Sequence, residues 1–217
     1  MTYKASIKTE SMAGLAGGVT SFMEMPNTKP PALTQNLLED KYEIGAADAN
    51  QIKCNPAIKE TSHKGKLMQG LLDDVLDIIA TDHAPHTWDE KCRNYLEAPS
   101  GLPLLQHSLN LMLDFHKEGK ISLEKIVEKM CHAPAECFRV KDRGYLREGY
   151  WADLALVDLE QEWMVEKNNV LYKCGWSPLE GKTFKGKVDK TILNGQLVYD
   201  QHQGFLKRNA MRMKFRS

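Results

Sequence analysis

The chain has 217 residues and an ordinary globular composition, with 42% hydrophobic and 27% charged residues. Its 29 Lys and Arg residues balance its 29 Asp and Glu residues, which argues against a nucleic-acid partner held by bulk charge. No apolar run reaches the length of about 18 residues that a membrane span needs, so no membrane partner is expected. The five cysteines form no C-x-x-C pair, which favours reduced thiols in a cytoplasmic protein.

The N-terminal part of the chain predicts a piece of an alternating α/β pattern. A helix is expected over residues 2–15, and Gly17-Gly18 ends it. A strand is expected over 19–25, where strand-forming residues alternate weakly. A proline-rich loop over 26–31 and a helix over 34–44 follow. This order of elements is typical of one α/β repeat.

The middle of the chain continues the alternation. A short strand is expected at 51–54, a helix over 64–72 and a strand over 75–80. The last of these is a continuous apolar run, as in a buried parallel strand. The polar loop over 87–101 is long for a compact domain, and long ordered loops are often functional. Further helices are expected over 105–116, from Ser122 onward and at Ala133 to Ala135.

From Gly149 the pattern changes to short alternating strands. They are expected at residues 152–158, 163–165, 188–193 and 196–199. Asn194-Gly195, between the last two, is a strong signal for a two-residue hairpin turn. We therefore predict a small all-β module at residues 149–200, followed by a basic tail at 201–217 that is solvated and partly disordered.

Polar side chains stand where the expected strands end. The strand over 75–80 runs into an aspartate and two histidines, and Asn27 and Asn55 follow the strands before it. Polar groups that several strand ends present to one face are the active-site pattern of (β/α) barrels. An aspartate after a strand is as often a turn or helix cap, and an H-x-x-H sequence in a loop is weak evidence for a metal site.

Four motifs, in this order along the chain, together resemble the dihydroorotases of the amidohydrolase superfamily. They are Met25-Pro26-Asn27-Thr28, Asn55-Pro56-Ala57-Ile58-Lys59, Thr81-Asp82-His83-Ala84-Pro85-His86 and Ala98-Pro99-Ser100-Gly101-Leu102. Residues 147–154 resemble the point where these enzymes leave the barrel for their β-sandwich. The resemblance implies an α/β fold: an incomplete TIM-type (β/α) barrel of the metal-dependent hydrolase kind over residues 1–148, which is catalytic, and then the β-sandwich module.

The resemblance also implies roles for five residues. Asp82 would be a metal ligand and the acid/base group that moves a proton from a metal-bound hydroxide to the departing amide nitrogen. His86 and Asn27 would bind the substrate carboxylate, and Asn55 the pyrimidine ring. The backbone at Gly101 would hold the carboxylate or the ring edge. The implied cofactor is Zn²⁺, binuclear in the family, and the implied small-molecule partners are dihydroorotate and N-carbamoyl-L-aspartate.

Other metal ligands of that family have no counterpart here, and no histidine precedes His63. Asp82 alone cannot hold zinc in a four-coordinate site. We therefore expect a dihydroorotase truncated at the N-terminus, with a large internal segment missing and with impaired activity. The alternatives are a related cyclic amidohydrolase (allantoinase or dihydropyrimidinase), a catalytically inactive dihydroorotase-like structural subunit, or a fragment without a folded function. Unpaired edges of an open barrel favour association, which leaves a homo-oligomer open.

Overall fold

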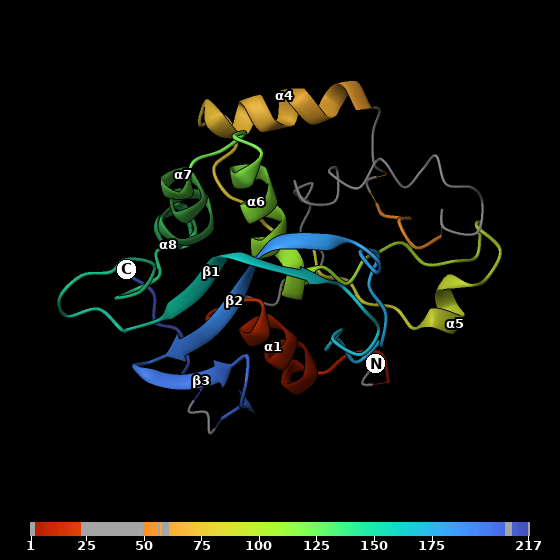
Figure 1. Ribbon diagram of the computed structural model, residues 1–217. Helices are drawn as coiled ribbons and strands as arrows, with labels where there is room; N and C mark the ends of the chain where they lie inside the picture. Colours follow the sequence, from red (N-terminus) through yellow and green to blue (C-terminus); the bar gives the residue numbers. More distant parts are fainter. Residues whose placement is uncertain (1–2, 23–49, 56, 58–60, 207–209, 217) are drawn as a thin grey trace.

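The computed structural model describes residues 3–22, 50–55, 57, 61–206 and 210–216. The helical elements come first along the chain and the strands follow (Figure 1). The helices and helical turns are α1 (Ile7–Ala16), α4 (Thr61–Leu72), α5 (Trp88–Lys91), η2 (Leu105–His107), α6 (Ser108–Lys117), α7 (Leu123–Val127), η3 (Glu128–His132) and α8 (Ala133–Cys137). The strands are β1 (Leu154–Met164), β2 (Thr183–Leu193), β3 (Gln196–Asp200) and β4 (Gly204–Phe205).

The four strands form one antiparallel sheet in the order β1-β2-β3-β4. Asn194 and Gly195 join β2 to β3 with positive φ angles of 52° and 77°, as a tight hairpin turn between right-twisted strands requires. The predicted hairpin is thus confirmed. The segments predicted as separate strands at 152–158 and 163–165 are one long strand, β1, which bulges between Asp158 and Glu162.

The second layer over the sheet is helical in the part of the chain that the structure describes. Both α1 and α6 pack against β2 (Figure 1). The hydroxyl of Thr191 donates to the carbonyl of Leu15 at 2.7 Å, and the side-chain amide of Asn110 donates to the carbonyl of Gly186 at 3.0 Å. The β-sandwich predicted at 149–200 is therefore not found among these residues, which form a single sheet under helices.

The predicted helices agree well with the structure where it describes them. Ser6 caps α1 by accepting from the backbone N–H of Thr9, and Ser122 caps α7 by accepting from that of Lys125. Gly17 ends α1 where a Cβ atom would lie 2.2 Å from the carbonyl oxygen of Gln106, so only glycine allows this approach. The loop and helix predicted over 26–31 and 34–44 lie outside the described residues.

The predicted strands before residue 149 are wrong wherever the structure describes them. Within the described ranges, residues 19–22, 51–54 and 75–80 are assigned to no strand. The backbone N–H of Ile79 donates to the carbonyl of Lys129 instead, at 3.1 Å. A parallel strand forms only when neighbouring strands complete its hydrogen bonds, and the described residues supply one isolated parallel bridge, between His83 and Leu102.

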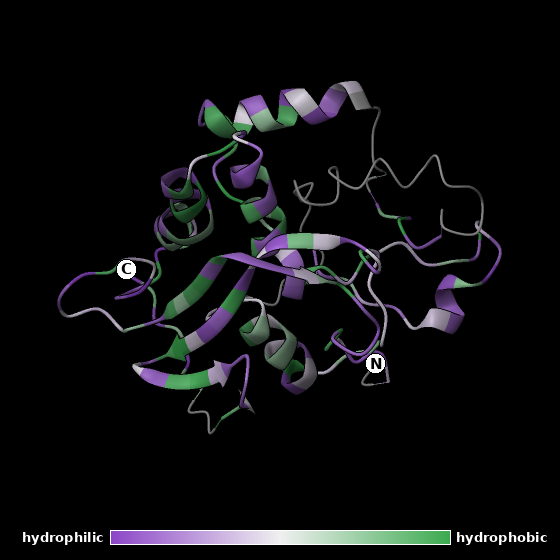
Figure 2. Ribbon diagram, in the orientation of Figure 1, coloured by the Kyte–Doolittle hydropathy of each residue, from purple (hydrophilic) through white to green (hydrophobic). Residues whose placement is uncertain are grey.

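Two hydrophobic clusters meet on α6. One lies toward the sheet and contains Ile52, Leu102, Leu104, Leu111, Val165 and Phe184 among others. The other lies under α4 and contains Leu71, Ile79, Met112, Phe115, Ile121 and Ile126. Figure 2 shows hydrophobic residues on α6 and along the strands, with hydrophilic residues at many of the turns. Since Leu111 and Met112 are neighbours in sequence, α6 joins the two clusters.

The end of the C-terminal tail, residues 214–216, packs against the body, while the partial disorder expected for the tail stays a prediction. The backbone N–H of Lys141 donates to the carbonyl of Lys214 at 2.8 Å, and Arg216 pairs with Glu136 at 2.7 Å. These contacts anchor residues 214–216 beside the segment that follows α8. None of the helices in the described ranges is long and apolar enough to cross a membrane.

His107, the last residue of η2, is fully buried among the rings of Trp163, Tyr172 and Phe184. Its Nδ1 lies 3.3 Å from the hydroxyl of Ser177, and its Nε2 has no hydrogen-bond partner among the described residues. Burial lowers the pKa of His107 to about 3. The imidazole is therefore neutral in the folded protein at pH values where the unfolded chain would protonate it.

Acid should destabilise the protein through His107. The folded-state pKa is about 3 and the unfolded value is 6.5, so stability falls as the pH drops below 6.5. Between pH 7 and pH 5 we expect the free energy of unfolding to fall by about 2 kcal/mol from this group. Urea titrations at both pH values measure it. The variant H107Q, which cannot titrate, should lose about 2 kcal/mol less over this interval; an equal loss would contradict the assignment.

Candidate functional site

The candidate site lies where two loops meet. The parallel bridge between His83 and Leu102, with a hydrogen bond from the N–H of Ala84 to the carbonyl of Leu102 at 3.0 Å, joins the 82–86 segment to the 100–102 segment. Asp82 directly precedes this bridge, with an exposed side chain and a positive φ of 45°. Three residues singled out from the sequence, Asp82, His86 and Gly101, therefore lie on two segments that run side by side.

Gly101 permits the close contact between the two segments. Its φ is 133°, a conformation that side chains rarely adopt. A Cβ atom at this position would lie 2.6 Å from the carbonyl oxygen of Ala84 and 3.1 Å from Cδ2 of His86. The close approach seen here is to the protein's own chain, and a role of Gly101 toward a substrate stays a prediction.

His86 is half-buried beside two charged residues. Its Nδ1 lies 2.9 Å from Nζ of Lys4, and a lysine ammonium can only donate, so Nδ1 is the acceptor. Glu90 is 3.6 Å from the same nitrogen, and the indole N–H of Trp176 donates to the carbonyl of His86 at 2.7 Å. Burial, together with the Lys4 cation, lowers the pKa of His86. The site therefore combines an imidazole with a lysine cation and a carboxylate.

Lys4 is a site residue that sequence reasoning missed. It lies in a short polar stretch before α1, 82 residues away from His86 in sequence. No motif or spacing marks it, and a lysine near a terminus is ordinarily solvated. Only the folded chain brings its ammonium group to the imidazole.

His83 is held in place by hydrogen bonds inside the protein. Its Nδ1 accepts from the backbone N–H groups of Leu104 and Leu105 at 3.1 and 3.3 Å, so its proton is on Nε2. That nitrogen donates to Glu10 of α1 at 2.8 Å. Burial alone would raise the pKa of Glu10, but hydrogen bonds from His83 and Thr9 outweigh it and hold the pKa below the usual value. Both nitrogens of His83 are thus engaged inside the protein.

Of the two asparagines singled out from the sequence, the structure describes Asn55. Asn55 is exposed, and it lies two residues after Lys53, whose carbonyl accepts from the N–H of Gly101 at 2.9 Å. The segment that carries Asn55 is therefore fastened beside Gly101. Asn27 lies outside the described residues, and its role stays a prediction.

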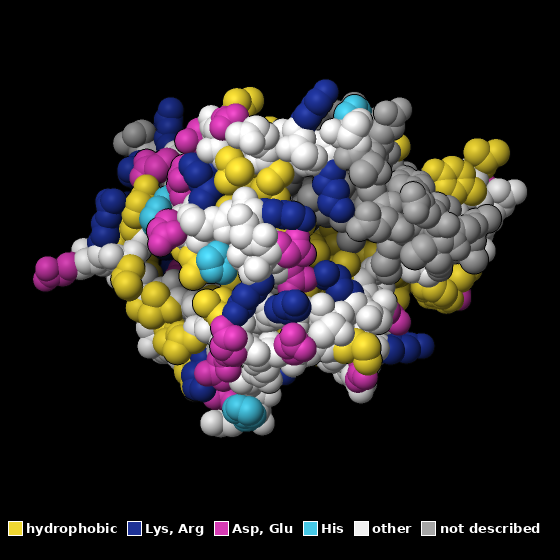
Figure 3. All heavy atoms as spheres, turned by 45° about the horizontal axis from the view of Figure 1, so that its top comes forward, with side chains coloured by type: hydrophobic (Ala, Val, Ile, Leu, Met, Phe, Trp, Pro, Cys, Tyr) yellow, Lys and Arg dark blue, Asp and Glu magenta, His cyan; other side chains and the backbone are white. Residues whose placement is uncertain are grey.

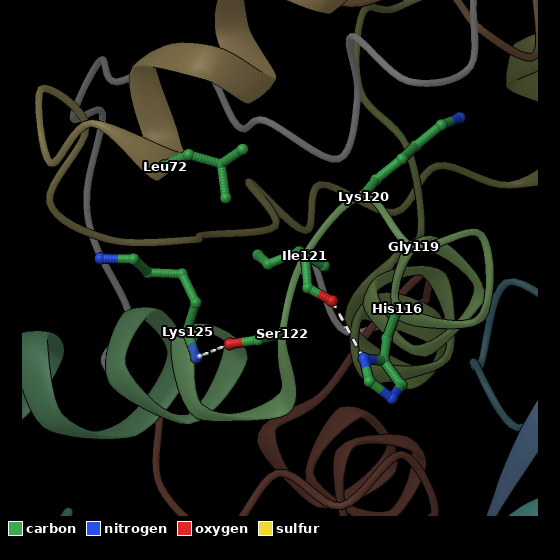
Figure 4. Close-up of a pocket in the computed structure, with 7 residues that line it drawn as sticks. All are labelled: Leu72, His116, Gly119, Lys120, Ile121, Ser122 and Lys125. Atoms are coloured by element: carbon green, nitrogen blue, oxygen red, sulfur yellow. Dashed lines mark hydrogen bonds between the residues drawn. The ribbon is translucent and has the colours of Figure 1, made fainter.

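A second hollow, of about 390 Å³, lies under the end of α4, away from these loops (Figure 4). His116, Lys120 and Lys125 line it, and the imidazole Nδ1 of His116 bonds to the carbonyl of Ile121 at 3.0 Å. Its two cations are already neutralised, because Lys120 pairs with Glu118, and Lys125 with Asp74 and Glu128. This hollow therefore offers no free charge for a ligand. On the face drawn in Figure 3, basic and acidic side chains are mixed, and no basic patch stands out.

The chain was compared with protein families and individual proteins of known sequence. A profile of the amidohydrolase family matches residues 48–198. A dihydroorotase of Clostridium acetobutylicum is 38% identical over 149 residues, which are 68% of this chain and 35% of the relative. A dihydroorotase of Pyrococcus abyssi is 39% identical over 152 residues, which are 70% of this chain and 36% of the relative.

Solved structures resemble the fold as well. An L-hydantoinase (dihydropyrimidinase) of Arthrobacter aurescens superposes with a TM-score of 0.71 at 25% identity, over 80% of this chain and 40% of that one. A D-hydantoinase superposes with a TM-score of 0.72 at 22% identity, over 78% of this chain and 39% of that one. These structures support a fold of the TIM-barrel-like, metal-dependent hydrolase kind.

The described site is a polar loop site that follows an apolar segment, which is where (β/α) barrels carry polar site residues. With the profile match over most of its length, the chain belongs to the amidohydrolase family. It is similar to dihydroorotases, and it spans a little over a third of the length of the dihydroorotase relatives named above.

The amidohydrolase family is metal-dependent, and the described residues do not fit a zinc site. Among them, no three His, Cys, Asp or Glu side chains lie together so that they could hold a metal ion. Both nitrogens of His83 are engaged in the protein, and Nδ1 of His86 faces the ammonium of Lys4. A zinc ion needs about four such donors. The expectation that Asp82 binds metal therefore stays a prediction.

Substitution of Gly101 by alanine should lower the free energy of unfolding by more than the strain of a positive φ alone would. In G101A the new methyl group would meet the backbone of Ala84, so we expect a loss of at least about 2 kcal/mol in the free energy of unfolding. Gly149 is a matched control, since its φ is 81° and nothing lies within 4 Å of a Cβ there. G149A should cost about 1 kcal/mol. Equal losses in urea denaturation would show that the contact with Ala84 is unimportant.

Proposed function

We propose that this chain carries the proton-transfer and substrate-binding part of a dihydroorotase-type cyclic amidohydrolase. The reaction is the hydrolysis of the cyclic amide of dihydroorotate to N-carbamoyl-L-aspartate. The observation that carries the proposal is the pairing of His83 with Leu102, which sets His86 and Lys4 beside Gly101 directly after Asp82. The identity of 38–39% to two dihydroorotases supports the choice of substrate.

The proposed roles follow from the chemistry of each group. Water adds to the ring carbonyl, the C–N bond breaks, and the leaving nitrogen must take up a proton. The exposed carboxylate of Asp82 is suited to take a proton from the attacking water and to deliver it to that nitrogen. His86 and Lys4, with Asn27, would bind the substrate carboxylate, because the imidazole and the ammonium group of Lys4 meet there.

Two further assignments complete the proposal. Asn55 would bind the pyrimidine ring, since its segment is fastened to Gly101 through the carbonyl of Lys53. Residues 1–148 would form the catalytic barrel part, residues 149–200 the β module and residues 201–217 the tail.

Loss of the carboxylate-binding groups should weaken substrate binding. We expect H86A and N27A each to raise the KM for dihydroorotate by about tenfold, which corresponds to the loss of one charge-assisted hydrogen bond. A coupled absorbance assay of ring opening measures it. His202 is exposed on the β3–β4 turn, so H202A serves as the control and should leave the KM unchanged.

Two outcomes would change the assignment. Undiminished turnover of dihydroorotate in both H86A and N27A would rule out the proposed carboxylate site. Faster turnover of dihydrouracil, hydantoin or allantoin, which lack the carboxylate, would instead favour a dihydropyrimidinase or an allantoinase, in line with the similarity to the hydantoinase of Arthrobacter aurescens.

A second candidate function is that of a catalytically inactive, dihydroorotase-like structural subunit. The observation that favours it is the donor set, because the described residues contain no three side chains arranged to hold a metal ion. A subunit of this kind binds no stoichiometric metal and turns over no substrate.

Metal titration separates the two functions. The inactive subunit should retain well under one zinc per chain after dialysis against Zn²⁺, measured by elemental mass spectrometry. Its melting temperature should also not respond to zinc, since a metal that binds only the folded chain would raise it. One tightly held zinc per chain, lost in D82N, would exclude this candidate and support the hydrolase.

A further inference from the structure

Lys91 is a buried cation at the end of α5. Its side chain is 1% exposed, although lysine is almost never fully buried without a partner. Its Nζ donates to three backbone carbonyls: those of Pro99 at 3.0 Å, Gly101 at 3.2 Å and Lys53 at 3.3 Å. An ammonium group has three donors and no acceptor, so these carbonyls satisfy it completely.

The three carbonyls belong to segments that carry the candidate site. Lys53 lies two residues before Asn55, and the 99–101 segment contains Gly101. The carbonyl of Lys53 also accepts from the N–H of Gly101 at 2.9 Å, so the ammonium completes a bond that already joins the two segments. Lys91 thus bonds at once to the chain beside Asn55 and to the chain at Gly101.

The third site segment is joined to Lys91 through α5 itself. That helix begins directly after His86, with a reciprocal cap in which Thr87 and Glu90 bond each other's backbone N–H. The indole of Trp176 lies 6.0 Å from Nζ of Lys91, and its N–H donates to the carbonyl of His86 at 2.7 Å. The segments of Asn55, His86 and Gly101 therefore converge on one ammonium group.

Lys91 is an ammonium at neutral pH. Burial lowers its pKa to about 8, with Cys54 acting to raise it and Lys53 to lower it. Among the described residues, the titratable, charged or aromatic groups around it include these two, the Trp176 ring and His86, whose pKa the Lys91 charge helps to lower. At pH 7 the charged form is still about tenfold in excess, so three N–H donors are available.

We propose that Lys91 is a positioning residue of the site: its ammonium ties together the three segments that carry Asn55, His86 and Gly101. It touches no substrate and acts through the backbone that it fastens. The expected effect of Lys91 on substrate binding rests on the proposed function. Its role in holding the three segments together can be tested without any substrate.

The test compares K91M with K129M. Lys129 is an equally buried lysine, 2% exposed, whose Nζ donates to the carbonyl of Leu76 at 2.8 Å, in the other cluster. Hydrogen exchange in the full chain is followed at the N–H groups of Gly101 and Leu76, together with the Kd for dihydroorotate by calorimetry. If K91M unfolds, K91R, which keeps the charge and N–H donors, takes its place.

We expect K91M to speed exchange at Gly101 by at least tenfold and to raise the Kd at least tenfold, with K91R intermediate. K129M should speed exchange at Leu76 and leave both Gly101 and the Kd unchanged. Unchanged exchange at Gly101 in K91M, or faster exchange with an unchanged Kd, would overturn the inference. A wild-type chain that binds no dihydroorotate would refute the proposed function instead, and exchange at Gly101 alone would then decide the role of Lys91.

Discussion

The site depends on a backbone pairing, the parallel bridge of His83 with Leu102. In a complete sheet, a ladder of hydrogen bonds would share the work of fixing two strand ends. Here buried polar side chains hold the two segments in place. Glu10 holds His83 from α1, Trp176 holds the backbone of His86, and Lys91 gathers the carbonyls around Gly101. Each of these contacts comes from a different element, so the geometry of the site reflects the packing of the described body.

The body that supports these contacts is organised by α6. One side of the helix faces the sheet, where Asn110 bonds the carbonyl of Gly186, and the other faces α4 and α7 through Met112. The two hydrophobic clusters are therefore mechanically joined, although their members come from separate parts of the chain. The loops of the site project from one cluster, since Leu102 and Leu104 are buried in it.

Local chemistry made part of the fold predictable from the sequence. Ser122 caps a helix because a hydroxyl near a helix start satisfies free N–H groups, and Asn194-Gly195 turns because both residues tolerate positive φ. The strand predicted over 75–80 failed because its stability depends on neighbours, which composition does not reveal. The role of Lys91 was not predicted for a related reason, because only the folded structure shows whether a lysine is solvated or buried. The proximity of His86 and Gly101 was implied by motif resemblance, whereas Lys4 carried no signal at all.

The long strand β1 has a consequence for how molecules of this protein meet one another. It is the outermost strand of the described sheet, and an open edge invites pairing with another chain. Asp158, Glu160 and Glu162 lie along it, around a bulge that interrupts the regular ladder. Acidic charge and an irregular backbone both oppose edge-to-edge stacking. This border of the sheet therefore opposes the regular edge-to-edge pairing from which fibrous aggregates grow.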